Sequence, residues 1–258
     1  MIVTTSQRPS GRTIERALRL AEELGAVYVP RGTRTIRALQ AAAGATETLV
    51  VGPQDTKLTA ADGPAFYFHP SMALVRIKSL IAGGTDSLLS VSGVRAGDTV
   101  IDCTAGLGSD SLVLSYAAGE SGKVTALEAV HKVHLVVREG LRTYESGIPE
   151  ADRAMRAIEA IHARYEDWLP RMEDDSADVV YFDPMFEKPV TASSAIGPLR
   201  GLAVHRPLTR EAVREAARVA RRRVVLKDHR DSGRFEQLGF RVAKSSSTAV
   251  AYGVIDID

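Results

Sequence analysis

Short apolar runs alternate with longer amphipathic stretches through the second half of the chain. The runs that predict strands are residues 99–102, 123–127, 156–161, 178–182 and 223–226. Helical spacing of apolar positions predicts helices at 112–117, 130–144, 207–220 and 234–238, and the segments 241–243 and 249–257 predict a closing hairpin. This order predicts an α/β fold: a doubly wound, mostly parallel sheet with helices on both faces and a C-terminal antiparallel hairpin.

The first part of the chain follows a different pattern. Strands are predicted at 2–4, 48–51 and 65–68, and a helix at 10–24 begins at Ser10 and closes at Gly25. A second helical stretch, 72–92, is interrupted at Gly83 and Gly84, which predicts two helices with a joint. We therefore expect a small N-terminal α/β lobe at residues 1–70 and a larger domain at 71–258.

Composition narrows the class of protein. The 258 residues are 45% hydrophobic and 25% charged, and no run approaches the roughly 20 apolar residues that span a bilayer. Residues 1–5 lack the pattern of a secretory signal, so a cytoplasmic location is expected. The single cysteine, Cys103, excludes an internal disulfide and the usual zinc spacings. A net charge of +1 neither supports nor excludes an RNA substrate.

Loops that follow parallel strands meet at one edge of the sheet, where ligands bind. The first of them, residues 102–110, carries Gly106 and Gly108, which allow a tight turn and a close approach of a ligand to the backbone. A dinucleotide fingerprint needs a third glycine where Ser111 stands. Asp102 and Asp110 suit the cationic S-adenosylmethionine better than a pyrophosphate. A plain strand-to-helix turn is the alternative.

Two further loops offer contacts for a nucleoside. Glu128 ends the second strand, where a carboxylate can accept hydrogen bonds from ribose hydroxyls in either cofactor class. After the third strand, Arg164 and Tyr165 stand where a base is commonly contacted. Alternatively, Tyr165 and Trp168 simply pack under the following helix.

The loop after the fourth strand predicts the chemistry. Residues 183–186 read Asp-Pro-Met-Phe, a variant of the (Asn/Asp)-Pro-Pro-(Phe/Tyr) loop of enzymes that methylate exocyclic amines. A planar amine delocalises its lone pair, so acceptors that orient it and take its proton assist methyl transfer. We take Asp183, Pro184 and Phe186 as candidate catalytic residues. A proline turn that merely ends a buried strand is the alternative.

With these loops in view, the chain resembles the RsmJ family of bacterial methyltransferases, which act on a guanine N2 amine of small-subunit ribosomal RNA. The matching segments are residues 102–110, 161–163, 180–186 and 223–227. The resemblance implies a Rossmann-like class I methyltransferase fold, and S-adenosylmethionine contacts at Ser109, Asp110, Glu128, Ala129, Arg164, Tyr165 and Asp183. The chain departs from the family at Ser109, where an arginine is usual, at 81–87, which lacks the family's arginines, and after Phe186.

The leading hypothesis is therefore methylation of a guanine N2 amine in RNA. The expected substrate-binding residues are Met185, Phe186, Lys188 and Lys227. Candidate phosphate contacts are Lys188, Arg200, Arg206 and the stripe Arg210, Arg214 and Arg218. A solvated stripe paired with Glu211 and Glu215 explains the last three equally well. The run 221–223 is interpreted as basic residues at a helix C-terminus.

Other functions stay open from the sequence alone. The acceptor can be an amine of a protein or a small molecule. A nicotinamide-dependent oxidoreductase has no use for the loop at 183–186, and a non-catalytic binding module does not explain Asp183. No metal is required, although His131 and His134 stand at helical spacing.

Overall fold

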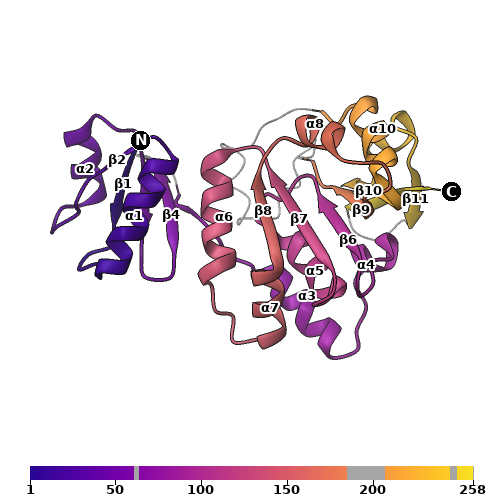
Figure 1. Ribbon diagram of the computed structural model, residues 1–258, viewed down its shortest axis with the longest axis horizontal. Coiled ribbons are helices and arrows are strands. Elements are labelled where there is room, and N and C mark those ends of the chain that lie inside the picture. Colours follow the sequence, from indigo (N-terminus) through magenta and orange to yellow (C-terminus); the bar gives the residue numbers. More distant parts are fainter. Residues whose placement is uncertain (61–63, 185–206, 245–248, 258) are drawn as a thin grey trace.

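The computed structural model describes residues 1–60, 64–184, 207–244 and 249–257 (Figure 1). These residues form two sheets, one of five strands and one of seven. The larger sheet has the order β11-β12-β10-β9-β6-β7-β8. Its strands are β6 (Thr99–Asp102), β7 (Lys123–Glu128), β8 (Ile158–His162), β9 (Ala177–Phe182), β10 (Ala220–His229), β11 (Arg241–Lys244) and β12 (Val250–Asp256).

Strand direction in the larger sheet confirms the predicted fold class. The pairs β6–β7, β7–β8, β6–β9 and β9–β10 are parallel, whereas β12 runs antiparallel to both β10 and β11. The chain winds from β6 outward to β8 and then crosses back to β9. The switch in winding direction therefore lies between β6 and β9, which places the residues after both strands side by side at the carboxyl edge.

Helices cover both faces of this sheet. They are α3 (Ser71–Ile81), α4 (Ser87–Ser92), α5 (Ser109–Ala118), α6 (His131–Thr143), α7 (Pro149–Ala157), α8 (Tyr165–Trp168), α10 (Arg210–Val219) and α11 (Arg234–Gln237), with a 3-10 turn at Leu169–Arg171. Alternate residues of β9 face opposite ways: Val179 packs with α3 to α7, and Val180 packs with α10 and α11. Both faces are thus apolar, as a doubly wound sheet requires.

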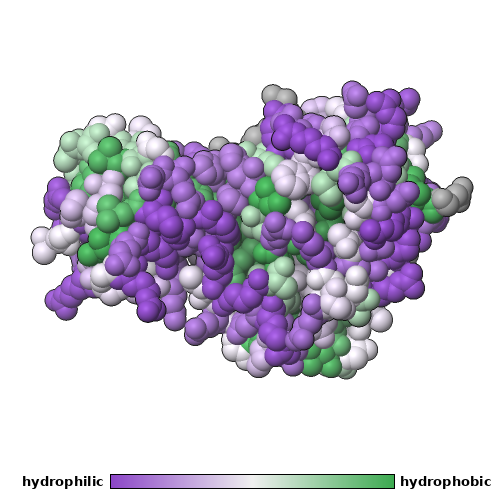
Figure 2. Space-filling view, in the orientation of Figure 1, coloured by the Kyte–Doolittle hydropathy of each residue, from purple (hydrophilic) through white to green (hydrophobic). Residues whose placement is uncertain are grey.

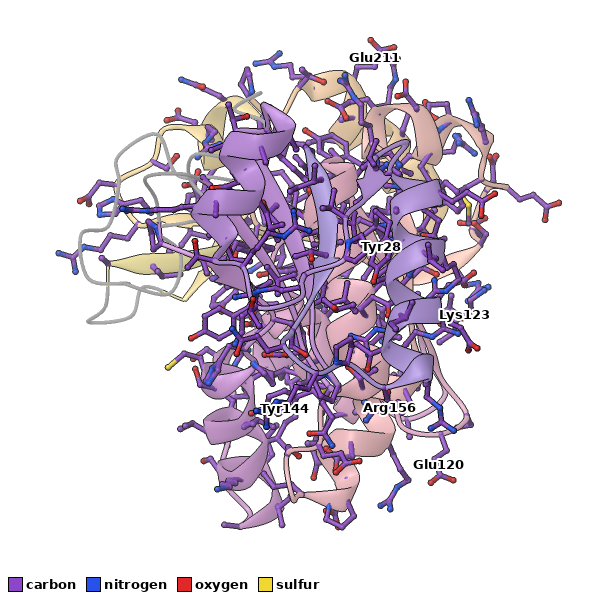
Figure 3. All side chains as sticks on the ribbon, turned by 90° about the vertical axis from the view of Figure 1, so that its left-hand side faces the viewer. Tyr28, Glu120, Lys123, Tyr144, Arg156 and Glu211 are labelled. Atoms are coloured by element: carbon purple, nitrogen blue, oxygen red, sulfur yellow. The ribbon has the colours of Figure 1, made fainter. Side chains whose placement is uncertain are left out.

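One predicted boundary and one predicted element were wrong. The third strand, expected at 156–161, is β8 at Ile158–His162; its first two predicted residues end helix α7, which forms because Pro149 suits a first helical turn and Glu150 and Asp152 follow it. Arg156, near the end of α7, donates to the Tyr144 carbonyl at 2.6 Å, and both residues are labelled in the lower half of Figure 3. The run 221–223 does not end a helix: α10 stops at Val219, and β10 begins at once.

The N-terminal lobe has its own sheet, in the order β2-β1-β3-β4-β5. Its elements are β1 (Ile2–Thr5), α1 (Gly11–Glu23), β2 (Val27–Tyr28), α2 (Ile36–Ala43), β3 (Glu47–Val51), β4 (Thr56–Ala60) and β5 (Phe66–Tyr67). Ser10 caps α1 by accepting from the backbone of Thr13 at 3.2 Å, as expected. The sequence analysis missed β2, α2 and β4.

The lobe lies beside α6 (Figure 1) and contacts it through charged and apolar residues. Glu139 of α6 is 2% exposed and pairs with Arg19 at 3.2 Å and Arg16 at 3.3 Å from the lobe. Hydrophilic residues cover this junction in Figure 2. Beneath them, Phe68 packs so closely on Gly140 that an added Cβ would lie 2.2 Å from the ring. The boundary at residue 70 stays a prediction, because one apolar cluster contains residues from both sides of it.

Candidate active site

The loop after β6 folds back onto the end of β7. Gly106 and Gly108 have φ values of 51° and 72°, the left-handed region that favours glycine. The Gly106 N–H donates to Glu128 Oε2 at 3.2 Å, and the Val130 N–H donates to Oε1 of the same carboxylate at 2.8 Å. Burial raises the pKa of Glu128, while these N–H groups oppose the rise. Two loops predicted to bind one ligand are thus joined through Glu128.

Asp102 lies beneath the loop rather than on its surface. It is 1% exposed, and its oxygens accept from the Ser111 hydroxyl at 2.5 Å and from the Thr104 N–H at 3.0 Å. Burial raises the pKa of Asp102 to about 7, although both donors oppose the rise. Ser111, which occupies the place of a third glycine, therefore fixes Asp102, and Asp102 shapes the turn.

Asp183 follows β9 and reaches the same edge. Its backbone N–H donates to Thr104 Oγ1 at 2.6 Å, which ties it to the loop after β6. Its side chain is 26% exposed, and Oδ2 accepts from Lys227 Nζ at 2.7 Å. Burial raises the pKa of Asp183 to about 6; Lys227 opposes the rise and the carboxylate of Asp110 adds to it. At neutral pH this is a partly exposed carboxylate beside the glycine loop.

Lys227, which was expected to touch the substrate, bridges two carboxylates instead. Its Nζ donates to Asp110 Oδ2 at 2.8 Å as well as to Asp183. Burial lowers the pKa of Lys227, but the two carboxylates outweigh it and raise the value overall. The ammonium group is therefore charged and holds Asp183 at a fixed distance from α5.

Asp110 is the centre of this network. Besides Lys227 it accepts from the Tyr181 hydroxyl at 2.8 Å and from Arg76 Nη1 at 2.5 Å. Burial would raise the pKa of Asp110, but Lys227 and Arg76 lower it well below its usual range. Arg76 also holds Asp86 through two bonds of 2.7 and 3.0 Å. The chain of contacts runs from the segment before β6 to the Asp-Pro turn.

The sequence analysis did not find Arg76, Asp86 or Tyr181. Arg76 lies on α3, outside every strand-end loop, and Tyr181 lies inside an apolar strand. Asp86 offered a signal, because it precedes α4 as an N-cap and accepts from Leu89 N at 3.2 Å. Nothing in the spacing of these residues reveals that they meet.

In the loop after β8, Arg164 forms ion pairs and Tyr165 packs on a neighbouring strand. Arg164 pairs with Glu166 at 3.0 Å and with Asp167 at 3.7 Å. The Tyr165 ring stands edge-on to the ring of Phe182, with centroids 5.3 Å apart. Tyr165 thus packs against the end of β9, and the role of Tyr165 toward a base stays a prediction.

Of the remaining residues predicted to form the site, the structure describes some and does not describe others. Ser109 is half-buried as the first residue of α5, the Ala129 carbonyl lies 3.2 Å from His162 Nε2, and Pro184 is buried. Residues outside the described part of the chain are Met185, Phe186, Lys188, Arg200 and Arg206.

Stacking joins the histidines of this region. The rings of His131 and His162 lie 4.4 Å apart and nearly parallel, and His134 stacks at 5.8 Å from His162. Within the ranges that the structure describes, no group of three or more histidine, cysteine or carboxylate side chains is placed to hold a metal ion.

The arginine stripe on α10 is largely occupied by neighbours. Arg210 donates to the Gln237 carbonyl at 3.0 Å, and Arg214 pairs with Glu211 at 3.1 Å. Arg218 pairs with Glu215 at 2.9 Å and also donates to carbonyls of the 3-10 turn. These contacts favour the solvated stripe over a row of free phosphate contacts.

Comparison with known proteins decides the family. The family described as "Putative SAM-dependent methyltransferase" matches residues 39–243. The chain belongs to this family. It is a methyltransferase, and S-adenosylmethionine is its methyl donor. The "Uncharacterized protein YpiP" of Bacillus subtilis (strain 168) is 44% identical over 98% of each chain.

More distant similarities agree with this assignment. The ribosomal RNA small subunit methyltransferase J of Marinobacter nauticus is 36% identical over 36% of this chain and 32% of its own length. The chain thus spans about a third of that relative. A SAM-dependent methyltransferase structure from Neisseria gonorrhoeae covers 99% of the chain and 96% of its own, with a TM-score of 0.64 and 18% identity, and shows the same fold. No helix among the described residues is long and apolar enough to cross a membrane.

The carboxyl edge fits the methyl donor of this family. S-adenosylmethionine carries ribose hydroxyls, which need acceptors, and positive charge, which favours carboxylates. The structure supplies both: Glu128 and Asp183 lie partly exposed at the edge, and the left-handed glycines bring bare backbone beside them.

Proposed function

We propose that this methyltransferase transfers a methyl group to the exocyclic N2 amine of a guanine in small-subunit ribosomal RNA. The observation that carries the proposal is Asp183: a partly exposed carboxylate, held by Lys227 and Thr104 beside the glycine loop. The part-length similarity to ribosomal RNA small subunit methyltransferase J proteins supports the choice of RNA.

The chain's own residues divide the work of holding the donor. Glu128 accepts from the ribose hydroxyls, because each of its oxygens keeps a lone pair beyond the bond to Gly106 or Val130. The backbone from Gly106 to Ser109 lies beside the bound donor. Ala129, Arg164 and Tyr165 contact the adenine base of the donor. When bound, the cofactor supplies an electrophilic methyl group on a sulfonium. Asp102 and Asp110 support the site from beneath, since both are buried and hydrogen-bonded.

Asp183 acts on the acceptor amine. Its carboxylate accepts an N–H of the amine, which turns the nitrogen lone pair toward the methyl group and lowers the cost of the positive charge that develops there. The N–C bond would form as the bond between the donor sulfur and the methyl carbon breaks, which would leave a neutral thioether. The amine proton would pass to an Oδ atom of Asp183 and then to solvent. With its pKa raised to about 6, Asp183 is ionised at neutral pH and is still a better base than an ordinary aspartate.

Lys227 serves this step indirectly. Because its Nζ is bound to both Asp110 and Asp183, it sets the position of the Asp183 carboxylate. We therefore assign Lys227 a positioning role in place of direct substrate contact.

The proposal for how the guanine base is recognised comes from the sequence of residues 184–188. Pro184 stiffens the turn, Phe186 provides an aromatic face on which an unpaired guanine stacks, and Met185 and Lys188 complete the contacts. The N-terminal lobe at residues 1–70 is proposed to hold RNA rather than the donor, since the proposed donor-binding loops lie beyond residue 98.

The test is mass mapping of modified nucleosides in small-subunit RNA. RNA from a strain lacking this gene is compared with RNA from the parent and from strains carrying the wild-type or the Asp183→Ala gene. We expect one N2-methylguanine to be lost in the deletion strain and restored by the wild-type gene alone. An unchanged modification pattern would refute the RNA substrate. Purified protein should still bind S-adenosylmethionine in that case, which separates the acceptor from the cofactor.

A further inference from the structure

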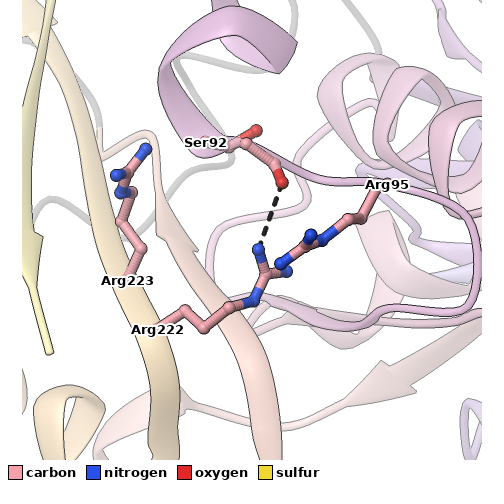
Figure 4. Close-up of a pocket in the computed structure, with 5 residues that line it drawn as sticks. Ser92, Arg95, Arg222 and Arg223 are labelled. Atoms are coloured by element: carbon pink, nitrogen blue, oxygen red, sulfur yellow. Dashed lines mark hydrogen bonds between the residues drawn. The ribbon is translucent and has the colours of Figure 1, made fainter. Parts of the chain in front are cut away.

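A pocket of about 260 Å³ lies at the opposite edge of the large sheet from Asp183. It is lined by Ser92, Gly93, Arg95, Arg222 and Arg223 (Figure 4). These residues come from the end of α4, the turn before β6 and the start of β10. Since parallel strands place their first residues at one edge and their last at the other, this pocket is separate from the proposed methyl-transfer site.

Two of the arginines are fixed by the protein itself. Arg222 donates to the Gly93 carbonyl at 3.3 Å and pairs with Asp98. Arg223 donates to the Val91 carbonyl at 2.6 Å and pairs with Asp256, also at 2.6 Å. A guanidinium has five N–H donors in a rigid plane, so both groups keep donors that these contacts do not use. Their positions are thus set before any ligand arrives.

Arg95 has a different environment. Its side chain is exposed and makes no ion pair or hydrogen bond with the part of the chain that the structure describes. Its backbone is bound to Asp98 instead: the Arg95 N–H donates to the Asp98 carboxylate at 2.9 Å, and the Arg95 carbonyl accepts from the Asp98 N–H at 3.1 Å. Figure 4 shows the tips of Arg95 and Arg222 turned toward one another. Two guanidinium groups that converge in this way repel each other unless an anion lies near both.

The carboxylates around the pocket do not balance its positive charge. Asp98 is 7% exposed and is shared between Arg222 and the Arg95 backbone. Asp256 is shared between Arg223 and Arg241, and Asp178 between Arg221 and Arg222. Within the described residues, three carboxylates therefore face five arginines, and Arg95 is the one whose side chain makes no ion pair with any of them.

Ser92 adds a neutral donor. It is 1% exposed, and its hydroxyl oxygen has no hydrogen-bond partner among the described residues. A buried hydroxyl without a partner is unfavourable, so buried hydroxyls are normally bonded. Ser92 lines the pocket, so a rotation of its side chain toward the pocket would let this hydroxyl donate to an oxyanion there.

We propose that this pocket binds a phosphate group, through Arg95, Arg222, Arg223 and the Ser92 hydroxyl. Three guanidinium groups and one hydroxyl match a tetrahedral oxyanion with several acceptor oxygens. The phosphate is either that of free inorganic phosphate or a phosphodiester of an RNA backbone. Because the pocket lies at the edge away from Asp183, an RNA phosphate bound there belongs to a part of the RNA distant from the methylated base.

Calorimetric titration of the full chain with inorganic phosphate at low ionic strength tests this site. The informative variant is Arg95→Gln, because the exposed Arg95 side chain makes no ion pair or hydrogen bond with the described residues whose loss would destabilise the fold. The matched control is Arg142→Gln, which removes an exposed arginine at the end of α6 that, like Arg95, makes no side-chain ion pair or hydrogen bond among the described residues. We expect phosphate affinity to fall at least roughly tenfold in Arg95→Gln, to fall less in Ser92→Ala, and to stay unchanged in the control.

A second titration, with a short single-stranded oligoribonucleotide, distinguishes the sources. If the site takes a backbone phosphate, Arg95→Gln weakens RNA binding and reduces the slope of log affinity against log salt by about one. If it takes free phosphate alone, RNA binding is the same in both proteins while phosphate binding differs. The proposal is overturned if neither probe distinguishes Arg95→Gln from wild type.

Discussion

Strand β9 carries an aspartate near each end, and the two have opposite electrostatic surroundings. Asp178, at the amino edge, accepts from the Thr99 N–H at 2.8 Å and pairs with Arg221 at 3.1 Å. Burial would raise the pKa of Asp178, but Thr99 and Arg221 lower it overall. Asp183, at the carboxyl edge, has a raised pKa, because burial outweighs Lys227, a cation that it shares with Asp110. Its own cation and the Thr99 N–H therefore keep Asp178 ionised and weakly basic, whereas Lys227 only partly offsets the burial of Asp183, which leaves Asp183 available as a base.

The largest expected effect is a difference in methyl-transfer rate between alanine substitutions of these two aspartates. Asp183→Ala should slow single-turnover methyl transfer by at least about a hundredfold, because it removes the acceptor that orients the amine and takes its proton. Asp178→Ala should transfer at close to the wild-type rate and lose stability instead. Rapid-quench assays with the true acceptor and urea unfolding measure the two effects. Normal turnover by Asp183→Ala would rule out the amine-methylation mechanism even with the cofactor assignment intact.

A second substitution tests whether Glu128, at the carboxyl edge of the sheet, binds the methyl donor. Glu128→Ala should weaken S-adenosylmethionine binding by roughly tenfold or more, because hydrogen bonds to a charged acceptor are lost. The matched control is Glu159→Ala on β8, since Glu159 is 51% exposed and pairs only with Lys123 in the described structure. Calorimetry of both variants is the measurement. Equal affinities would show that Glu128 does not contact the donor.

A third experiment concerns the packing of the N-terminal lobe on α6 rather than the chemistry of the carboxyl edge. Gly140→Ala should destabilise the protein by about 1–3 kcal/mol, because an added methyl group collides with Phe68. Gly11→Ala is the control, since a Cβ there meets nothing within 4 Å. Urea denaturation followed by circular dichroism compares them. If Gly140→Ala is as stable as Gly11→Ala, the lobe is not packed on α6 as described.

The smallest expected effect is a shift in pH dependence. The active form of Asp183 is ionised, so the rate of methyl transfer should rise with pH and reach half its maximum near pH 6. Arg76→Gln removes one of the cations on Asp110, so Lys227 is drawn toward Asp110 and the pKa of Asp183 rises, by about one unit. The half-maximal pH should move upward accordingly, and Arg76→Lys should restore it in part. A pH–rate profile that does not move would remove Arg76 from the network.

Local patterns predicted most of the larger sheet. The strand at 99–102 matched β6, and the break at Gly83 and Gly84 separated α3 from α4 as expected. Errors arose where short elements carry weak patterns. The strand at 56–60 was missed. The helix before β8 was also missed, because its apolar residues are mostly small alanines, and the third strand was therefore predicted to begin two residues early, at 156.

The candidate site was predictable only as far as its loops. Gly106, Glu128 and Asp183 each follow a strand, so topology alone brings them to one edge. The pairing of Lys227 with Asp110 and Asp183, and of Arg76 with Asp86, depends on side chains from elements far apart in sequence. Periodicity carries no information about such contacts, so the sequence analysis assigned Lys227 to the substrate.

The contact between Glu139 and the lobe has a consequence for how the protein is made. Arg19 lies 120 residues before Glu139 in the chain. On a ribosome the whole lobe is therefore synthesised before α6, the helix that covers its charged face. Until α6 is synthesised, Phe68 also lacks Gly140, the residue on which it packs. The lobe can form its own sheet early, but it can dock only after α6 has left the exit tunnel. Nascent chains halted before and after α6 should therefore differ sharply in the protease resistance of the lobe.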